Sequence, residues 1–302
     1  MVSFSVIIPN RNNPDLLRRA LGSVPIREDL EVIVVDDASD PTKIDFLDYP
    51  GTGRPGTTVV LGEGGKGAGH ARNVGLSRAR GRWLIFLDSD DFFTPDLPAI
   101  LDRYSGSDAD VIYFDITSVY SDTLQPSPRH EDRSSMFAKY RYKPEELDFY
   151  CRYIYSEPWG KLIRRELVES NSIRFDETLC ANDYMFTALT GLSARKTLFD
   201  PAVIYCVTQR QGSLSSDYFS SPAMLAARLD VYCRVDRLFS RNSIPLFPFS
   251  GLWMMCRKKG EQSRRAADEF CKANGISRIS VLYDCLRRIV RKHLRIGVPY
   301  CN

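Results

Sequence analysis

Histidine is scarce in this chain of 302 residues, and no two of its cysteines lie close together in the sequence. Histidine occurs only at positions 70, 130 and 293, and the eight cysteines contain no C-x-x-C motif. This spacing argues against a zinc cluster and, in a chain of this length, against a framework of disulfide bonds. We therefore expect reduced and mostly buried thiols, as in a cytosolic protein.

Long apolar runs and a basic N-terminal segment are missing too. The longest apolar stretch, near residues 246–256, is too short to cross a bilayer and contains a proline. The first residues run directly into a strand pattern, so we expect no signal peptide and a cytoplasmic location. The net charge of +3 conceals an asymmetry, because residues 257–302 carry a net +8 and the preceding residues a net −5. A mildly acidic body thus carries a basic tail.

The first hundred residues alternate strand-like apolar runs with helical spacing. Strands are expected at residues 4–8, 31–35, 57–61 and 82–87, and helices at residues 15–24 and 70–79. A further helix is expected to begin at Pro95, with Thr94 as its cap. Continuous apolar strands separated by helices predict an α/β fold with a mostly parallel sheet flanked by helices on both faces.

The rest of the chain is less regular. A strand is expected at residues 110–119, whereas the polar, proline-containing residues 120–146 read as a long loop or mobile insertion. Short elements at 159–165 and 172–175, a helix at 181–192 and strand-like segments at 197–207 should follow. From Pro222 onward the pattern is helical and ends in a helix over residues 276–295.

Three acids follow the fourth predicted strand, at Asp88, Asp90 and Asp91. Ligands of α/β sheets bind at the carboxyl ends of the strands. A divalent cation there can use one or two carboxylates and leave positions open for diphosphate oxygens. The alternative is a helix cap or a turn, since aspartate favours both. One aspartate is enough for a cap, so the accumulation of three favours a ligand site. Asp91 is expected to do no more than hold the turn.

A rival interpretation comes from the glycine-rich turn. Residues 62–67 match G-x-G-x-x-G, follow a strand and precede a helix, and Asp88 lies about twenty positions further on. These features are typical of a dinucleotide-binding oxidoreductase. However, Asp90 and Asp91 are not needed to hold a ribose, and Glu63 would lie beside the pyrophosphate. This interpretation is therefore the weaker one.

Other polar residues fit the metal interpretation better. Asp37 follows the second predicted strand and could accept hydrogen bonds from a base or a ribose, although an Asx turn would also explain it. Arg11 and Arg72 lie near the same sheet edge and suit phosphate groups. Each of these arginines, taken alone, would more often be a solvated surface residue.

The order of these motifs resembles glycosyltransferase family 2. The matching segments are residues 4–12, 34–39, 69–75, 86–91, 158–166, 181–186 and 205–213. The resemblance covers residues 4–217 and implies a GT-A-type, Rossmann-like catalytic domain. Its residues 1–105 would bind the nucleotide sugar and residues 106–217 the acceptor. Residues 218–302 lie outside it as a basic helical C-terminal region.

The resemblance also implies an activity and a donor site. Such enzymes move a sugar from a nucleotide donor, usually a UDP-sugar, with inversion at the anomeric carbon. Asp90 and Asp88 would ligate Mn²⁺ or Mg²⁺, with Asp88 also toward the ribose. The donor-binding residues would be Pro9, Asn10, Arg11, Asp37, Arg72, Asp88, Ser89, Asp90 and Arg210.

On the acceptor side, the resemblance assigns the general base to Asp183. Its task is to remove the proton of the attacking hydroxyl, and the alternative is a helix N-cap. The family usually has Glu-Asp here, whereas this chain has Asn182-Asp183, which leaves acceptor orientation open. Trp159 offers an aromatic face for a sugar, although a buried tryptophan is the more common case. Asn182 and Trp159 are thus the predicted acceptor-binding residues.

The basic tail has one apolar stripe, formed by Ile279, Leu282, Leu286, Ile289 and Val290. A basic amphipathic helix over residues 276–295 could rest on an anionic membrane surface, peripherally at the inner face of the plasma membrane. The alternative is a helix that packs on the domain and exposes a basic face. Nucleic acid is not expected as a partner, because no recognition motif accompanies the basic residues.

The sequence thus predicts a metal-dependent inverting glycosyltransferase. The resemblance implies a saccharide or lipid-linked acceptor and a place in bacterial surface polysaccharide synthesis. Two other hypotheses remain: the NAD(P)-dependent oxidoreductase built on the turn at residues 62–67, and a non-catalytic sugar-nucleotide-binding protein associated with a membrane.

Overall fold

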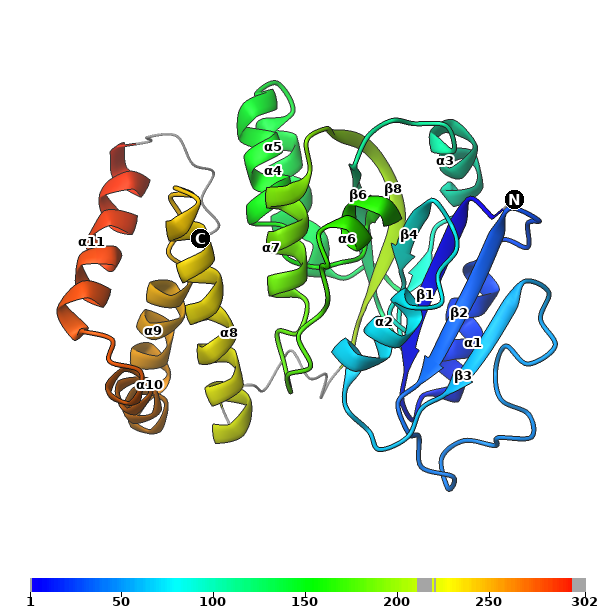
Figure 1. The fold of residues 1–302 in the computed structure, drawn as a ribbon, viewed down its shortest axis with the longest axis horizontal. Helices are drawn as coiled ribbons and strands as arrows, with labels where there is room; N and C mark the ends of the chain where they lie inside the picture. Colours follow the sequence, from blue (N-terminus) through cyan, green and yellow to red (C-terminus); the bar gives the residue numbers. More distant parts are fainter. Residues whose placement is uncertain (1, 211–218, 220, 295–302) are drawn as a thin grey trace.

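The computed structural model describes residues 2–210, 219 and 221–294, with side chains up to residue 287 (Figure 1). Its strands are β1 (Phe4–Asn10), β2 (Leu30–Asp36), β3 (Thr57–Leu61), β4 (Trp83–Phe86), β5 (Phe92–Phe93), β6 (Val111–Tyr120), β7 (Lys161–Arg164) and β8 (Thr197–Gln209). Its helices are α1 (Pro14–Ser23), α2 (Ala68–Leu76), α3 (Leu97–Tyr104), α4 (Glu131–Tyr140), α5 (Pro144–Tyr153), α6 (Arg165–Ser170), α7 (Tyr184–Ser193), α8 (Pro222–Arg241), α9 (Pro248–Lys259), α10 (Glu261–Ala273) and α11 (Arg278–Leu294), with a 3-10 turn, η1, at Pro128–His130.

All described strands join one sheet, in the order β3-β2-β1-β4-β7-β6-β8-β5. The first four are parallel, as predicted. In the second half β7 is antiparallel to both of its neighbours, so the sheet as a whole is mixed. Figure 1 shows α1 and α2 on opposite faces of β1–β3, as right-handed crossovers in opposite directions along the sheet require.

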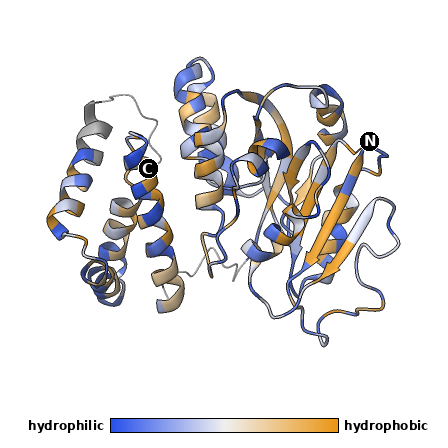
Figure 2. Ribbon diagram, in the orientation of Figure 1, coloured by the Kyte–Doolittle hydropathy of each residue, from blue (hydrophilic) through white to orange (hydrophobic). Residues whose placement is uncertain are grey.

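The register of these strands creates the edge at which the site lies. Asn10 is paired with Asp36 at the ends of β1 and β2, and Ile7 is paired with Phe86 of β4. The chain segments that leave β1, β2 and β4 therefore start side by side. These three strands are buried throughout, and Figure 2 shows them mostly in the hydrophobic colour, so this edge is anchored in the main core.

The prediction of a long loop at residues 120–146 was wrong. This segment forms the end of β6, the turn η1, helix α4 and the start of α5. Pro128 and Pro144 stand in the first turns of their helices, where proline is tolerated. The apolar residues that anchor α4 and α5 are too widely spaced among polar ones to stand out in the sequence; they are Met136, Phe137, Tyr140, Leu147, Tyr150 and Cys151.

Three smaller expectations also differ from the structure. Helix α3 begins at Leu97, and the Thr94 hydroxyl donates to the carbonyl of Val203 instead of capping it. Residues 172–175 are neither helix nor strand, and α7 begins at Tyr184. In each case a tertiary contact, such as the Thr94–Val203 bond or the burial of Phe175, outweighs the local pattern.

The C-terminal helices α8–α11 form a second cluster beside the sheet domain (Figure 1). Helix α8 belongs to both parts, because Val231, Val235 and Phe239 pack with Ala188 of α7. The other face of α8 packs into the α9–α11 cluster. The predicted domain boundary at residue 217 lies outside the described residues. Helix α8 packs against both the sheet domain and the C-terminal helices.

The cysteines and the hydropathy of the helices agree with the sequence analysis. The seven cysteines up to Cys285 are free thiols and nearly all are buried. Within residues 2–210 and 221–294, no helix is both long and apolar enough to cross a membrane.

Candidate functional site

The two acids at the end of β2 have different tasks. Asp36 is buried, and its carboxylate accepts hydrogen bonds from the Ser39 amide at 2.8 Å and from the Tyr49 hydroxyl at 2.8 Å. Asp37 instead accepts from the Gly67 amide at 2.8 Å and lies 3.7 Å from the guanidinium of Arg11. Asp36 therefore holds the turn, and Asp37 is the acid that joins β1, β2 and the glycine-rich turn.

The glycine-rich turn does not have the surroundings of a dinucleotide site. It follows β3, which is the edge strand of the sheet, whereas the dinucleotide fingerprint follows the first strand of its βαβ unit. Its last amide, that of Gly67, donates to Asp37. A Cβ atom at Gly62 would lie 2.5 Å from the Asp36 carbonyl oxygen, so this glycine serves the close approach of two chain segments.

Asp91, the last acid of the cluster, points into the protein. Its carboxylate accepts from the Tyr205 hydroxyl at 2.7 Å and from the Thr208 amide at 2.6 Å. Burial, with the negative charges of Asp90 and Asp88, holds the pKa of Asp91 well above its usual range. Asp91 thus fastens the acidic turn to β8, the role that the sequence analysis left for it.

Arg72 connects the acidic turn after β4 with the start of α7. From helix α2 it donates to Asp88 Oδ1 at 2.5 Å and to Asn182 Oδ1 at 2.9 Å. Its side chain is only 7% exposed, so the interpretation of Arg72 as a solvated surface arginine was wrong. Asp88 and Asn182 are 94 residues apart in the sequence, and this guanidinium brings them together.

Asp90 and Asp88 are the two partly exposed acids of the cluster, with side chains that are 31% and 28% exposed. The backbone carbonyl of Asp90 accepts from Arg19 at 2.7 Å and from Thr208, which fixes the backbone, and its carboxylate lies 3.8 Å from Arg210. Burial and the nearby charge of Asp88 raise the pKa of Asp90. Two like charges held together in this way suit a divalent cation.

Such a cation would depend on further ligands. Among the residues described, no three His, Cys, Asp or Glu side chains are placed to hold a metal. Mg²⁺ and Mn²⁺ accept one or two carboxylates and complete their coordination with phosphate oxygens and water. Asp88 and Asp90 therefore fit a metal that arrives together with a diphosphate.

Asp183 stands in the N-cap position of α7, but its side chain makes no capping hydrogen bond. The interpretation as a helix cap therefore lacks its defining contact. Burial raises the pKa of Asp183 to about 6, although Arg72 opposes this effect. A carboxylate with that pKa is ionised at neutral pH and is a stronger base than an exposed aspartate.

The remaining predicted residues lie around this centre. Asn10 and Ser89 are buried, and Asn10 donates to the Tyr49 hydroxyl at 2.8 Å. Pro9 is buried in β1, whereas Arg11 is exposed next to the glycine-rich turn. The Trp159 indole is only 7% exposed and stacks on the Tyr205 ring at 4.9 Å, so it offers little surface to a sugar.

Several charged residues near Asp183 and the acidic turn were not identified as functional candidates from the sequence. Lys161 is buried and donates to the Tyr155 carbonyl at 2.7 Å, and burial lowers its pKa to about 7. Arg133 and Glu157 form an ion pair of 2.6 Å. Arg129 donates to the Thr208 carbonyl at 2.7 Å. No periodicity marks them, because they come from four different segments, namely η1, α4, the α5–β7 connection and β7.

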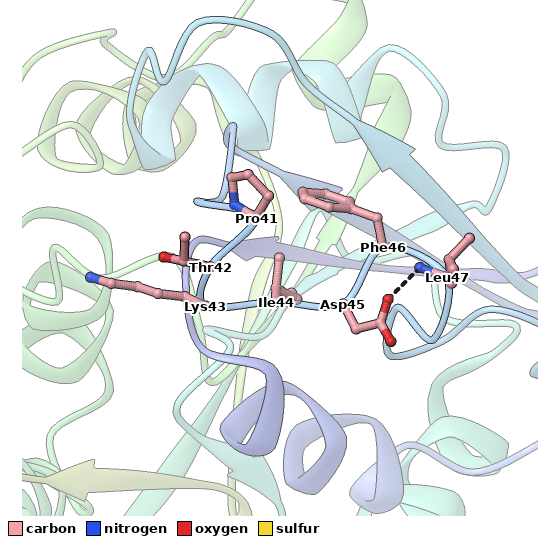
Figure 3. A pocket seen from close by; sticks show the side chains of 7 residues that line it. All are labelled: Pro41, Thr42, Lys43, Ile44, Asp45, Phe46 and Leu47. Carbon is pink, nitrogen blue, oxygen red and sulfur yellow. Dashed lines mark hydrogen bonds between the residues drawn. The ribbon is translucent and has the colours of Figure 1, made fainter.

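A surface hollow near the end of β2 lies apart from this chemistry. It is lined by residues 41–47 of the β2–β3 connection, and Figure 3 shows their side chains around it. Asp45 accepts from the Leu47 amide at 2.8 Å within this turn. None of the predicted site residues lines the hollow, so its shape carries no functional conclusion.

Comparisons with known proteins agree with the geometry. The family model described as "Glycosyl transferase family 2" matches residues 5–170. Poly(ribitol-phosphate) beta-N-acetylglucosaminyltransferase TarS of Staphylococcus aureus is 28% identical over 232 residues, which cover 74% of this chain and 38% of that protein. Succinoglycan biosynthesis protein ExoO of Rhizobium meliloti is 28% identical over 219 residues, covering 69% of this chain and 61% of that one.

A comparison with solved structures also finds a glycosyltransferase. The crystal structure of S. aureus TarS 1–349 in complex with UDP has a TM-score of 0.53 and 27% identity, covering 79% of this chain and 72% of that chain. The fold expected from the sequence, an α/β sheet of the GT-A type, is thus confirmed. The chain spans less than two thirds of the length of the curated relatives described above.

Proposed function

We propose, from the premise that this chain belongs to glycosyltransferase family 2, that it transfers a sugar from a UDP-sugar to an acceptor hydroxyl with inversion at the anomeric carbon. The observation that carries the proposal is the position of Arg72. It holds Asp88, at the end of β4, and Asn182, the neighbour of Asp183, within one hydrogen-bond network. A donor site and a base next to each other are what direct sugar transfer needs.

The donor side supports a nucleotide. Pro9, Asn10, Arg11 and Asp37 would line the nucleoside pocket, because they leave β1 and β2 at the same edge of the sheet. Ser89, Arg72 and Arg210 would face the sugar and the diphosphate. UDP is the preferred nucleotide, since a relative of 27% identity was solved with UDP bound.

The reaction needs one proton acceptor. The acceptor hydroxyl oxygen forms a bond to the anomeric carbon, its proton passes to the Asp183 carboxylate, and the bond from the anomeric carbon to the diphosphate oxygen breaks on the opposite face. The raised pKa of Asp183, which burial causes, keeps this carboxylate basic enough to take the proton. UDP then leaves with the electron pair of the broken bond.

Asp90 and Asp88 would hold Mn²⁺ or Mg²⁺, and the ion would neutralise the charge on the departing diphosphate. Arg210, 3.8 Å from Asp90, would add a second positive charge on the same side.

The acceptor is proposed to be a saccharide or a lipid-linked saccharide in bacterial surface polysaccharide synthesis. The names of the relatives, which refer to poly(ribitol-phosphate) and succinoglycan, support this class. Asn182, which Arg72 holds at 2.9 Å, is the main candidate contact, and Trp159 would add only the small exposed part of its indole.

A screen of UDP-sugars with Mn²⁺ tests the function. We expect UDP to raise the melting temperature in the presence of Mn²⁺, because a ligand that binds only the folded state stabilises it. We also expect at least one UDP-sugar to release UDP. Stabilisation by NAD(H) but not by UDP with Mn²⁺ would favour the oxidoreductase instead. UDP binding without UDP release from any donor would favour the non-catalytic hypothesis.

We further propose that α11 binds an anionic membrane surface. Val281 and Cys285 pack into the C-terminal cluster, so the contact with the domain does not use the stripe seen in the sequence. Its described members Ile279, Leu282 and Leu286 are exposed, while residues 289 and 290 lie outside the described side chains. The same helix carries Arg278 and Arg287, which are 61% and 45% exposed and pair with Asp268 and Asp284, and basic residues on a helix with an exposed apolar face suit anionic lipids.

Co-sedimentation with phosphatidylglycerol vesicles tests the membrane proposal. The double variant Leu282→Gln/Leu286→Gln should lose binding, and phosphatidylcholine vesicles should bind neither protein. Ile26→Gln, at an exposed apolar residue of the sheet domain, is the matched control. Equal binding by the double variant and the unmodified protein would refute the proposal.

A further inference from the structure

An ion pair lies on the acceptor side of the site. Arg133 of α4 and Glu157 of the α5–β7 connection are 2.6 Å apart. The guanidinium carbon of Arg133 also lies 3.8 Å from the centre of the Tyr155 ring and 5.1 Å from that of Trp159. Two aromatic rings and one carboxylate together fix this arginine in a single position.

The Glu157 segment is attached to the start of α7. The Thr187 hydroxyl makes hydrogen-bond contacts with the carbonyl of Ser156 at 2.8 Å and with that of Asp183 at 3.1 Å. Ser156 immediately precedes Glu157, so this hydroxyl brings Glu157 and the base onto one side of the site. The electrostatics agree: after burial, the charge of Glu157 is a further cause of the raised pKa of Asp183.

The carboxylate of Glu157 is not enclosed by its arginine. Its Oε2 atom is buried against Arg133. The side chain as a whole is nevertheless 31% exposed, so the exposed surface belongs to its other atoms. Burial opposes the charged form of Glu157, but the charge and the hydrogen bond of Arg133 outweigh it and lower the pKa of Glu157, so this partly exposed acid is a carboxylate anion next to the base.

We propose that Glu157 is an acceptor-binding residue and that Arg133 is the positioning residue that holds it. Glu157 accepts hydrogen bonds from hydroxyl groups of a sugar or polyol acceptor next to the hydroxyl that Asp183 deprotonates. A carboxylate is the side chain suited to this contact, because it accepts several hydrogen bonds and charge-assisted ones are stronger. The assignment rests on the proposed function, since it names contacts of the acceptor in that same site.

Glu157→Gln tests the contact. The UDP-sugar with the fastest hydrolysis in the screen above serves as donor, and methyl glycosides of glucose, galactose and N-acetylglucosamine serve as acceptors. For the glycoside with the highest transfer rate, we expect KM to rise about tenfold or more, because a hydrogen bond to a charged group is lost. Hydrolysis of the donor by water, which needs no sugar acceptor, should stay at the wild-type rate at a temperature where the variant is folded, although the loss of the ion pair with Arg133 should lower the melting temperature.

Variants of Arg133 test whether this residue positions Glu157 for the acceptor or only stabilises the fold. Arg133→Gln should raise the acceptor KM like Glu157→Gln, and Arg133→Lys, which keeps the charge, should fall between it and the wild type. The double variant should be no worse than either single one, since the two residues act as a unit. Arg141→Gln, at an exposed residue just after α4, is the matched control and should behave like the wild type.

The outcomes are distinct. A wild-type acceptor KM in Glu157→Gln, or equal losses of transfer and donor hydrolysis, would overturn the assignment. A wild-type enzyme that hydrolyses its donor but transfers to none of the glycosides would overturn the acceptor class. Failure of the wild-type protein to release UDP from any donor would instead count against the proposed function.

Discussion

The donor side and the acceptor side of the site hold their charged residues in different ways. On the donor side, Asp37 and Asp88 follow directly from the parallel strands β2 and β4, whose register brings them to one edge. On the proposed acceptor side, Asp183 comes from the α6–α7 connection and Glu157 from the α5–β7 connection, and side-chain contacts hold both segments. The strand register fixes the donor side locally, whereas the acceptor side depends on contacts between distant segments.

The largest expected effect comes from the base of the acceptor side. Asp183→Asn should lower transfer by about 10²- to 10⁴-fold, the usual contribution of a positioned general base. UDP binding in the presence of Mn²⁺ should be unchanged, because the donor side is intact. Calorimetric titration with UDP and a coupled assay of UDP release measure the two effects. Asp15→Asn, at an exposed acid of α1, is the control, and transfer at the wild-type rate in Asp183→Asn would refute the assignment.

Arg72 is the connection between the two sides, and its removal should affect both. Arg72→Gln leaves Asp88 and Asn182 without a shared partner, and breaking a buried ion pair costs about 3–5 kcal/mol of unfolding free energy. Urea unfolding measures this loss. Arg78→Gln, at an exposed arginine just after α2, should change the unfolding free energy by less than about 0.5 kcal/mol. Equal stabilities of the two variants would show that Arg72 does not couple the sides.

Tyr205 tests the donor side in a milder way. Tyr205→Phe removes the hydroxyl that donates to buried Asp91 at 2.7 Å. Leaving a buried acceptor without this partner should cost about 1–3 kcal/mol of unfolding free energy. Tyr142→Phe, at a tyrosine that is 85% exposed, is the control. A Tyr205→Phe protein as stable as the wild type would mean that the Asp91 anchor is not needed for the acidic turn.

The difference between residues fixed by strand register and residues held by distant contacts also explains how much of the site the sequence predicts. The four parallel strands, the acids at their ends and Asp183 are marked by local patterns and by the resemblance to the family. Arg133 has no such mark, because its segment is polar and contains prolines that also suit a loop. The segment forms helix α4 because Met136 and Phe137 are buried against the rest of the protein, and this packing places Arg133.

The surroundings of single residues could not be predicted for the same reason. The sequence analysis named Arg72 as a donor-binding residue, but its burial depends on the approach of Asn182, more than one hundred positions later. For Trp159 the sequence left both a ring that faces a sugar and a buried ring open, and stacking on Tyr205 leaves the indole little exposed surface. Contacts between distant segments decide both cases, and they leave no periodic signal.

The dependence of UDP release on pH tests the role of Asp183 most directly. A base must be deprotonated to act, and burial raises the pKa of Asp183 to about 6. The account predicts that kcat rises about tenfold per pH unit below pH 6 and levels off above it, and that Asp183→Asn lacks this rise. A wild-type rate that is constant between about pH 5 and 7, or the same rise in Asp183→Asn, would contradict it.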